Sequence, residues 1–216
     1  VEYYTTTVDG YNIKNTHVPE TVEVSGTKTW SDADNQDGLR PTSIKVNLFA
    51  DGVKIDSKVV IESDGWNYSF ANLPKFKAGK EIVYTITEEK VEGYTTEING
   101  TNIINSHTPE VTEVSGSKTW VDHNNQDGKR PESLIIDLFA DGERIDSKTV
   151  TEDDNWTWTF DNLPVYKDSG TEIQYTISEV TIPDYSTEIN GYNVTNSYTP
   201  GEKSRTVTKN WDDNNN

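Results

Sequence analysis

IKVNLFADG, residues 44–52, is the stretch of sequence that decides the fold. Ile44, Val46 and Leu48 stand at every second position, which is the period of a β-strand with one buried face. The Asp-Gly pair that follows is typical of a tight hairpin turn. A closely similar stretch, LIIDLFADG, occupies residues 134–142. We therefore predict the same β-hairpin at two places in the chain.

The two hairpins belong to a longer internal repeat. Thr29–Trp30 returns 90 residues later as Thr119–Trp120, and Asn72-Leu-Pro74 returns as Asn162-Leu-Pro164. Beyond that point the offset becomes 91, because one extra residue stands near 167–170. Such self-similarity is the sequence signature of tandem repeat domains.

The rest of each repeat also has the period of strands. Trp66, Tyr68 and Phe70 alternate with polar residues, and we expect the Asn-Leu-Pro sequence after them to break that strand. Short strands, regular turns and no helical period predict an all-β fold. Its tandem domains should be β-sandwiches of about 90 residues each.

Both ends of the chain continue the pattern. Residues 4–20 repeat the end of a unit, and residues 207–211 resemble the beginning of one. We predict four segments: the end of a preceding repeat at 1–20, whole repeats at 21–109 and 110–200, and the start of a following repeat at 201–216. The chain then represents a window of a longer array, in which neighbouring repeats are partners of one another.

Composition excludes several classes of function. The chain has 19 Lys and Arg against 37 Asp and Glu, a net charge of −18, which argues against binding to nucleic acids or to an anionic membrane surface. It has no Cys, so it has neither disulfides nor thiolate metal sites. No apolar run approaches the length of a membrane span, and no signal peptide is recognisable. Domains this small need another means of stabilisation if they are extracellular.

Three polar residues share a strand face with apolar residues in each whole repeat, because each follows apolar residues at every second position. They are Lys28, Glu88 and Asn105 in the first repeat and Lys118, Glu179 and Asn196 in the second. Buried polar groups need partners, so we expect the three to meet inside each domain.

Burial changes the chemistry of such a group of residues. A desolvated lysine loses its proton more readily and becomes a nucleophile, whereas a desolvated glutamate retains its proton. A neutral acid can polarise the asparagine carbonyl and help ammonia to leave. The product is a Lys–Asn amide, formed once and with no cofactor. The alternative is an unreacted Lys–Glu ion pair with a hydrogen-bonded asparagine.

The stretches that carry these residues resemble a known family. They are Lys28-Thr-Trp30, Tyr84-Thr-Ile-Thr-Glu88 and Asn102-Ile-Ile-Asn105, with Lys118-Thr-Trp120, Tyr175-Thr-Ile-Ser-Glu179 and Asn193-Val-Thr-Asn196. The chain resembles the CnaB-type B-repeat domains of the collagen adhesin and related surface proteins of Gram-positive bacteria, which are anchored to the cell wall. The resemblance implies a prealbumin-like, reverse-immunoglobulin sandwich.

The resemblance also implies site residues and a setting. It implies autocatalytic isopeptide bonds between Lys28 and Asn105, assisted by Glu88, and between Lys118 and Asn196, assisted by Glu179. Asn15 and Lys209 hold the matching positions in the partial units and should be unlinked. The implied location is the extracellular, wall-anchored surface.

The function predicted on this basis is that of a structural stalk or spacer of a surface adhesin. The alternative is an adhesive module that itself binds a host extracellular-matrix protein. Beyond the single-turnover cross-link, we predict no enzymatic activity, because no phosphate-binding loop or nucleophile elbow is present.

The acidic stretch from Asp32 to Gly38 is the one candidate metal site. Asp32, Asp34 and Asp37 suggest a calcium loop, but Gln36 stands where the EF-hand pattern needs an acceptor, and the glycine comes one residue late. A solvated acidic turn is the preferred interpretation, so we predict no metal.

Overall fold

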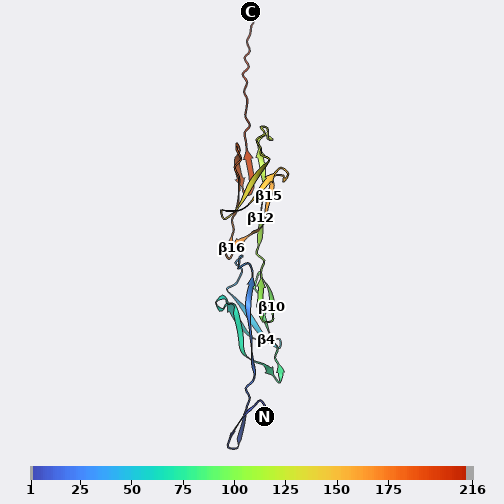
Figure 1. The fold of residues 1–216 in the computed structure, drawn as a ribbon, viewed down its shortest axis with the longest axis vertical. Coiled ribbons are helices and arrows are strands. Elements are labelled where there is room, and N and C mark those ends of the chain that lie inside the picture. Colours follow the sequence, from blue (N-terminus) through green and yellow to red (C-terminus); the bar gives the residue numbers. More distant parts are fainter. Residues whose placement is uncertain (1, 213–216) are drawn as a thin grey trace. The chain divides into compact units, whose positions relative to one another are not determined.

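The structure is a computed structural model, and it describes residues 2–212 (Figure 1). Almost all of its regular structure is β-strand, with one short 3₁₀ helix at Glu62–Asp64. The described residues divide into two compact units, one of residues 2–110 with 166–171 and the other of residues 111–165 with 172–212. No helix among the described residues is long and apolar enough to cross a membrane.

A separate hairpin precedes the first unit. It consists of β1 (Thr5–Asp9) and β2 (Asn12–Thr16), which pair antiparallel. Its residues are exposed throughout.

The first unit contains two main sheets. One has the strand order β10-β11-β3-β6, and the other has the order β5-β4-β9, with a small β7-β8 ladder beside them. The bounds are β3 (Thr21–Ser31), β4 (Ser43–Ala50), β5 (Val53–Ile61), β6 (Asn67–Pro74), β7 (Phe76–Lys77), β8 (Lys80–Glu81), β9 (Tyr84–Glu88), β10 (Thr95–Asn99) and β11 (Asn102–Ser106).

The second unit repeats this topology. Its sheets have the orders β15-β12-β20-β19 and β14-β13-β18. A short β16-β17 ladder stands between β15 and β18 in the sequence. The bounds are β12 (Val111–Val121), β13 (Ser133–Ala140), β14 (Glu143–Thr151), β15 (Thr157–Pro164), β16 (Tyr166–Lys167), β17 (Thr171–Glu172), β18 (Tyr175–Glu179), β19 (Ser186–Asn190) and β20 (Asn193–Ser197).

Each unit is a β-sandwich, because one apolar cluster joins residues of both sheets. In the first unit Val46 and Leu48 of β4 are fully buried, and they belong to the same core as Phe70 of β6 and Ile103 of β11. The second unit has an equivalent core. The predicted all-β sandwich fold is therefore confirmed.

The Asp-Gly hairpin turns are also confirmed. Asp51 and Gly52 join β4 to β5 with φ angles of 49° and 81°, and Asp141 and Gly142 join β13 to β14 with 50° and 86°. Positive φ at both central residues defines the turn type that matches the twist of paired strands.

The prediction that Asn72-Leu-Pro74 breaks its strand is wrong. Strand β6 continues to Pro74, and its register against β3 shifts between Val22 and Val24. Asn72 takes a φ of 57°, which asparagine tolerates better than most residues. The motif therefore forms a bulge within the strand, and the proline stands at the strand's last position, where the missing N–H is least costly.

Gly26 allows β3 to lie close to the turn between β10 and β11. A Cβ at this position would lie 1.9 Å from the carbonyl oxygen of Thr101. Gly116 has the same role beside Tyr192, where the distance would be 1.8 Å. The close approach keeps the first and last strands of each unit side by side, which positions the site described next.

Candidate functional site

The lysine and the asparagine lie on neighbouring strands of one sheet. In the first unit β3 carries Lys28 and β11 carries Asn105, and the two strands pair in parallel with Ile103 opposite Lys28. Asn105 lies two residues further along β11, so both side chains point to the same face, toward the core. The second unit has the same register, with Lys118 opposite Val194 and Asn196 two residues beyond it.

Both side chains are buried in both units. Lys28 is 4% exposed and Lys118 is 7% exposed, while Asn105 and Asn196 are not exposed at all. Apolar neighbours in the same strands impose this burial, because residues at every second position face the same core.

The glutamate comes from the opposite sheet. Glu88 ends β9, and Glu179 ends β18, in each case two residues after a buried isoleucine. In the second unit the Glu179 side chain is fully buried, and its Oε1 lies 3.8 Å from Lys118 Nζ. Asn196 Nδ2 donates a hydrogen bond of 2.8 Å to Oε2 of the same carboxyl group. Glu179 therefore lies between the lysine and the asparagine.

The first unit has the same three residues, but no hydrogen bond or ion pair in the described part of the chain joins them to one another. Among the described residues, neither amide atom of Asn105 has a hydrogen-bond partner, nor does Oε1 of Glu88. A buried amide without hydrogen bonds destabilises a fold, so the unpaired Nδ2 and Oδ1 of Asn105 require an explanation.

Burial weakens the lysines as bases. It lowers the pKa of Lys28 from 10.5 to about 8, although the negative charge of Glu88 partly opposes the effect. The pKa of Lys118 is lowered to about 8 for the same reason, with Glu179 opposing. A substantial fraction of each amine is therefore neutral near physiological pH.

A tryptophan lies beside each amine. Lys28 Nζ is 3.7 Å from the ring centroid of Trp30, and Lys118 Nζ is 3.8 Å from that of Trp120. Each Nζ also donates to the backbone carbonyl of the next residue, Thr29 at 2.8 Å or Thr119 at 3.1 Å. These contacts hold the amine inside the sandwich.

Sequence reasoning missed two hydroxyl groups at the site. Thr96 Oγ1 donates to Glu88 Oε2 at 3.0 Å, and Thr187 Oγ1 donates to Glu179 Oε2 at 2.9 Å. The available signal was their constant position, nine residues before the asparagine in every copy.

The acidic stretch considered for calcium serves local structure. Asp32 is buried, and its carboxylate accepts two hydrogen bonds from the Arg40 guanidinium, at 3.0 and 2.7 Å, and one from Tyr94 Oη at 2.8 Å. Burial opposes ionisation of Asp32, but the bonds from Arg40 and Tyr94 and from the Asn35 amide outweigh it and lower the pKa of Asp32 to about 2.

The other two carboxylates differ from Asp32 in their surroundings. Asp34 is exposed, whereas Asp37 lies 2.8 Å from His107 Nε2 and accepts a bond of 2.8 Å from the Glu110 amide. Within residues 2–212, no three acidic or histidine side chains form a group that could hold a metal ion.

Asn15 and Lys209, which match the site residues in the partial units, lie apart from the lysine, glutamate and asparagine of both whole repeats. Asn15 is on β2 and accepts a hydrogen bond of 2.6 Å from Thr6 Oγ1. Lys209 is exposed, outside any strand, and its Nζ lies 3.5 Å from the ring centroid of Trp211.

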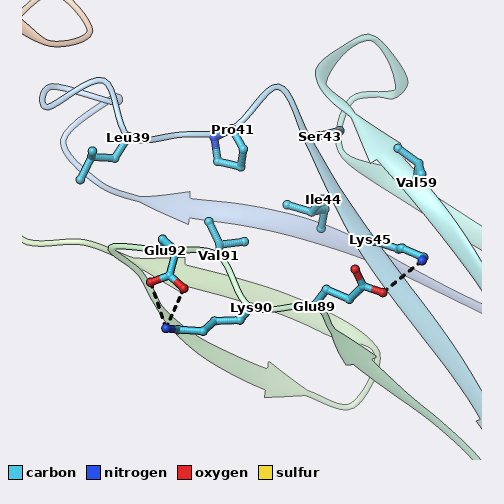
Figure 2. Close-up of a pocket in the computed structure, with 10 residues that line it drawn as sticks. All are labelled: Leu39, Pro41, Ser43, Ile44, Lys45, Val59, Glu89, Lys90, Val91 and Glu92. Carbon is cyan, nitrogen blue, oxygen red and sulfur yellow. Dashed lines mark hydrogen bonds and ion pairs between the residues drawn. The ribbon is translucent and has the colours of Figure 1, made fainter.

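A surface pocket of the first unit is separate from this site (Figure 2). Leu39, Pro41 and Val91 contribute to its apolar lining, and Lys45 pairs with Glu89 at 3.1 Å on its rim. None of the lysine, glutamate and asparagine residues of the buried cluster lines it.

Two tandem β-sandwiches, each with a buried lysine and a buried asparagine on neighbouring strands, define the class of this protein as that of repetitive β-domains. The family model described as "Cna protein B-type domain" matches residues 24–106 and 114–197. The chain therefore belongs to the Cna B-type domain family.

Individual relatives agree with this assignment. The chain is 45% identical, over 223 residues, to a collagen adhesin of Staphylococcus aureus; the match covers 100% of this chain and 19% of that protein. It also matches the crystal structure of two B repeat units of the S. aureus collagen binding protein, with 44% identity and a TM-score of 0.76, covering 100% of this chain and 59% of that one. The resemblance to the CnaB family inferred from sequence is confirmed.

Proposed function

We propose that each whole repeat forms an internal isopeptide bond and that the repeats act together as a mechanical spacer of a surface adhesin. The observation that carries the proposal is the group of a lysine, a glutamate and an asparagine that meet inside the second unit and stand at the same strand positions in the first. The first bond joins Lys28 to Asn105 and the second joins Lys118 to Asn196.

The reaction balances without any added reagent. A neutral lysine Nζ attacks Cγ of the asparagine side chain, and a new N–C bond forms. Nζ gives one proton to the glutamate, the neutral glutamate gives one proton to Nδ2, and the Cγ–Nδ2 bond breaks to release ammonia. The glutamate ends as it began, so each domain reacts once and is not an enzyme with turnover.

The electrostatics of the site support this chemistry. Burial lowers the pKa of both lysines to about 8, which provides the neutral nucleophile. The glutamate carboxyl of the second unit lies within reach of both the amine and the leaving nitrogen, at 3.8 and 2.8 Å. In the first unit the Asn105 amide is fully buried and makes no hydrogen bond to any described residue, so no such bond would have to break for it to react.

The mechanical role follows from the strand order. Tension enters a repeat at the start of its first strand, β3, and leaves at the end of its last strand, β11. A bond from Lys28 to Asn105 carries the load directly between these two neighbouring strands. The residues between them are then shielded from force, whereas an array without the bond extends by unfolding its domains.

The setting is proposed from the relatives. The chain spans about a fifth of the collagen adhesin that it matches. We infer that this chain likewise comes from a bacterial surface protein, extracellular and anchored to the cell wall, with the spacer repeats separate from the region that binds a host ligand.

Intact-mass spectrometry of the purified chain tests the cross-links. The expected mass is lower than the sequence mass by two ammonia molecules. In Glu88→Ala or in Glu179→Ala the mass deficit should fall to one ammonia molecule, and in the double variant it should disappear, once the mass of the substitution itself is allowed for. Asn15→Ala is the matched control, since its residue lies outside a cluster and should alter only the side-chain mass. A wild-type chain of full sequence mass would exclude both bonds.

One observation favours a second candidate, an adhesive module. The rim pair Lys45–Glu89 of the first unit is replaced in the second by Ile135 and Val180, which are 40% and 48% exposed. The two residues are neighbours, since the Val180 amide donates to the Ile135 carbonyl at 3.1 Å, and adjacent exposed apolar residues can contribute to an interaction surface. Binding of the fragment to matrix proteins, lost in an Ile135→Lys, Val180→Glu variant, would support this function.

A further inference from the structure

A threonine stands opposite the asparagine in every copy of the last hairpin. Thr96 is paired with Asn105 across β10 and β11, and Thr187 is paired with Asn196 across β19 and β20. The leading hairpin has the same pair, with Thr6 opposite Asn15. These residues lie on edge strands that are exposed at every position, the threonines included.

The threonine hydroxyl is directed to the buried cluster rather than to the solvent. In both whole repeats it donates to Oε2 of the glutamate, at 3.0 Å in the first and 2.9 Å in the second. Thr6 has no such glutamate and donates to Asn15 Oδ1 at 2.6 Å instead. The partner of the hydroxyl therefore changes with the presence of the glutamate.

This hydrogen bond fixes the orientation of the glutamate carboxyl group, whose two oxygens face different groups. In the second unit Oε2 lies 2.8 Å from Asn196 Nδ2, and Oε1 lies 3.8 Å from Lys118 Nζ. A donor bonded to Oε2 resists rotation of the carboxyl group about its terminal bond. Terminal carboxyl torsions are otherwise broad, so the orientation needs an external constraint.

We propose that Thr96 and Thr187 are positioning residues for cross-link formation, an inference that rests on the proposed function. In the second unit Thr187 holds Oε2 of Glu179 against the leaving amide nitrogen, which leaves Oε1 facing the lysine amine. Thr96 makes the same bond to Oε2 of Glu88 in the first unit, and we expect it to hold that oxygen in the same way when Asn105 reacts. One carboxyl group then takes a proton from Nζ at Oε1 and delivers the other proton from Oε2 to Nδ2. The hydroxyl itself exchanges no proton in the reaction.

The test measures the rate of bond formation. The chain is recovered from inclusion bodies in denaturant, where the unfolded domains have not reacted, and is refolded by dilution. Samples are quenched at intervals, the ammonia loss is measured by intact mass, and peptide mapping assigns each loss to a repeat. Thr96→Val keeps the shape and removes the hydroxyl, so it should slow the first repeat by about tenfold or more, as expected for a hydrogen bond to a charged or reacting group. The second repeat of the same molecule serves as the internal standard.

Two further variants separate positioning from structure. Thr96→Ser keeps the hydroxyl and should react within about threefold of the wild-type rate. Thr95→Val is the matched control on the same strand, because Thr95 Oγ1 donates to the Ser106 carbonyl and takes no part in the cluster. In an Asn105→Leu background, which cannot react, Thr96→Val should leave the unfolding midpoint almost unchanged.

The outcomes distinguish a failure of the proposed cross-link from a failure of the proposed threonine role. A wild-type chain that loses no ammonia removes the proposed function and this inference together. If the wild type loses two ammonia molecules but Thr96→Val reacts at the wild-type rate, the cross-link stands and the positioning role is wrong. The same conclusion follows if Thr96→Ser is as slow as Thr96→Val.

Discussion

The substitution Asn105→Leu should remove the cross-link of the first repeat and leave the packing of its core nearly unchanged. Leucine has nearly the shape of asparagine, and the Asn105 amide makes no hydrogen bond to any described residue, so little else is lost. Lys28 and Glu88 both remain, so the other two polar residues of the site are unchanged. The change therefore removes the bond with a small disturbance of the core.

The magnitude follows from the length of chain that the bond encloses. Lys28 and Asn105 are 77 residues apart in sequence. Treated in the same way as a disulfide, a loop of this length stabilises the fold by about 4.5 kcal/mol through the entropy of the unfolded chain. In a domain of about 90 residues, each 1 kcal/mol corresponds to a shift of about 4–8 °C in the melting temperature. The variant should therefore melt about 20–35 °C lower in its first repeat.

Differential scanning calorimetry of the whole chain measures this shift. The transition of the second repeat should stay in place and act as a standard within the same sample. Asn196→Leu should reverse the pattern, and Asn15→Leu should move neither transition, because Asn15 lies in the exposed leading hairpin. A first-repeat transition within a few degrees of the wild type would refute the reasoning.

Three other predictions concern the same units. The rate of ammonia loss on refolding should rise about tenfold per pH unit up to about pH 8 and then level off. Only the neutral lysines react, and burial lowers their pKa to about 8. A rate that is independent of pH between about 6 and 8 would contradict this prediction. Asp32→Asn should cost the first repeat about 2 kcal/mol in urea unfolding, because it weakens the bonds from Arg40 and Tyr94. The pKa of Asp32 is about 2 when folded and 3.8 ordinarily, so its contribution is present above pH 4 and is lost as the pH falls toward 2; the variant should lack this acid dependence. Gly26→Ala should destabilise the first repeat by about 2 kcal/mol or more, because the added Cβ would meet the Thr101 carbonyl at 1.9 Å, whereas Thr27→Ala on the same strand should cost less than half as much.

The sequence predicted the fold class because the period of a strand is local. Ile44, Val46 and Leu48 specify a buried face through spacing alone, and the 90-residue offset shows where the pattern starts again. The burial of Lys28, Glu88 and Asn105 could be inferred in the same way, from their parity with apolar neighbours. These inferences needed no knowledge of which strands are paired.

Local sequence was insufficient where two segments determine one conformation. Asn72-Leu-Pro74 has the composition of a strand terminator, but pairing with β3 carries the strand through it as a bulge. Asp32 and Asp37 have the composition of a metal loop, but Arg40, Tyr94 and His107 take up their carboxylates. Tyr94 and His107 are more than 60 residues away from these aspartates, so no pattern within the loop could reveal them.

The sequence by itself determined that the chain consists of β-repeats with a lysine, a glutamate and an asparagine turned inward, because side-chain direction in a strand depends only on position along it. Only the tertiary structure decided which groups meet. It paired β3 with β11 in parallel, set the glutamate of the facing sheet between amine and amide in the second unit, and directed a threonine hydroxyl from an exposed edge strand to that carboxyl group. Contacts of this kind depend on strand order and register across the whole domain, which the alternation of residues along one strand does not contain.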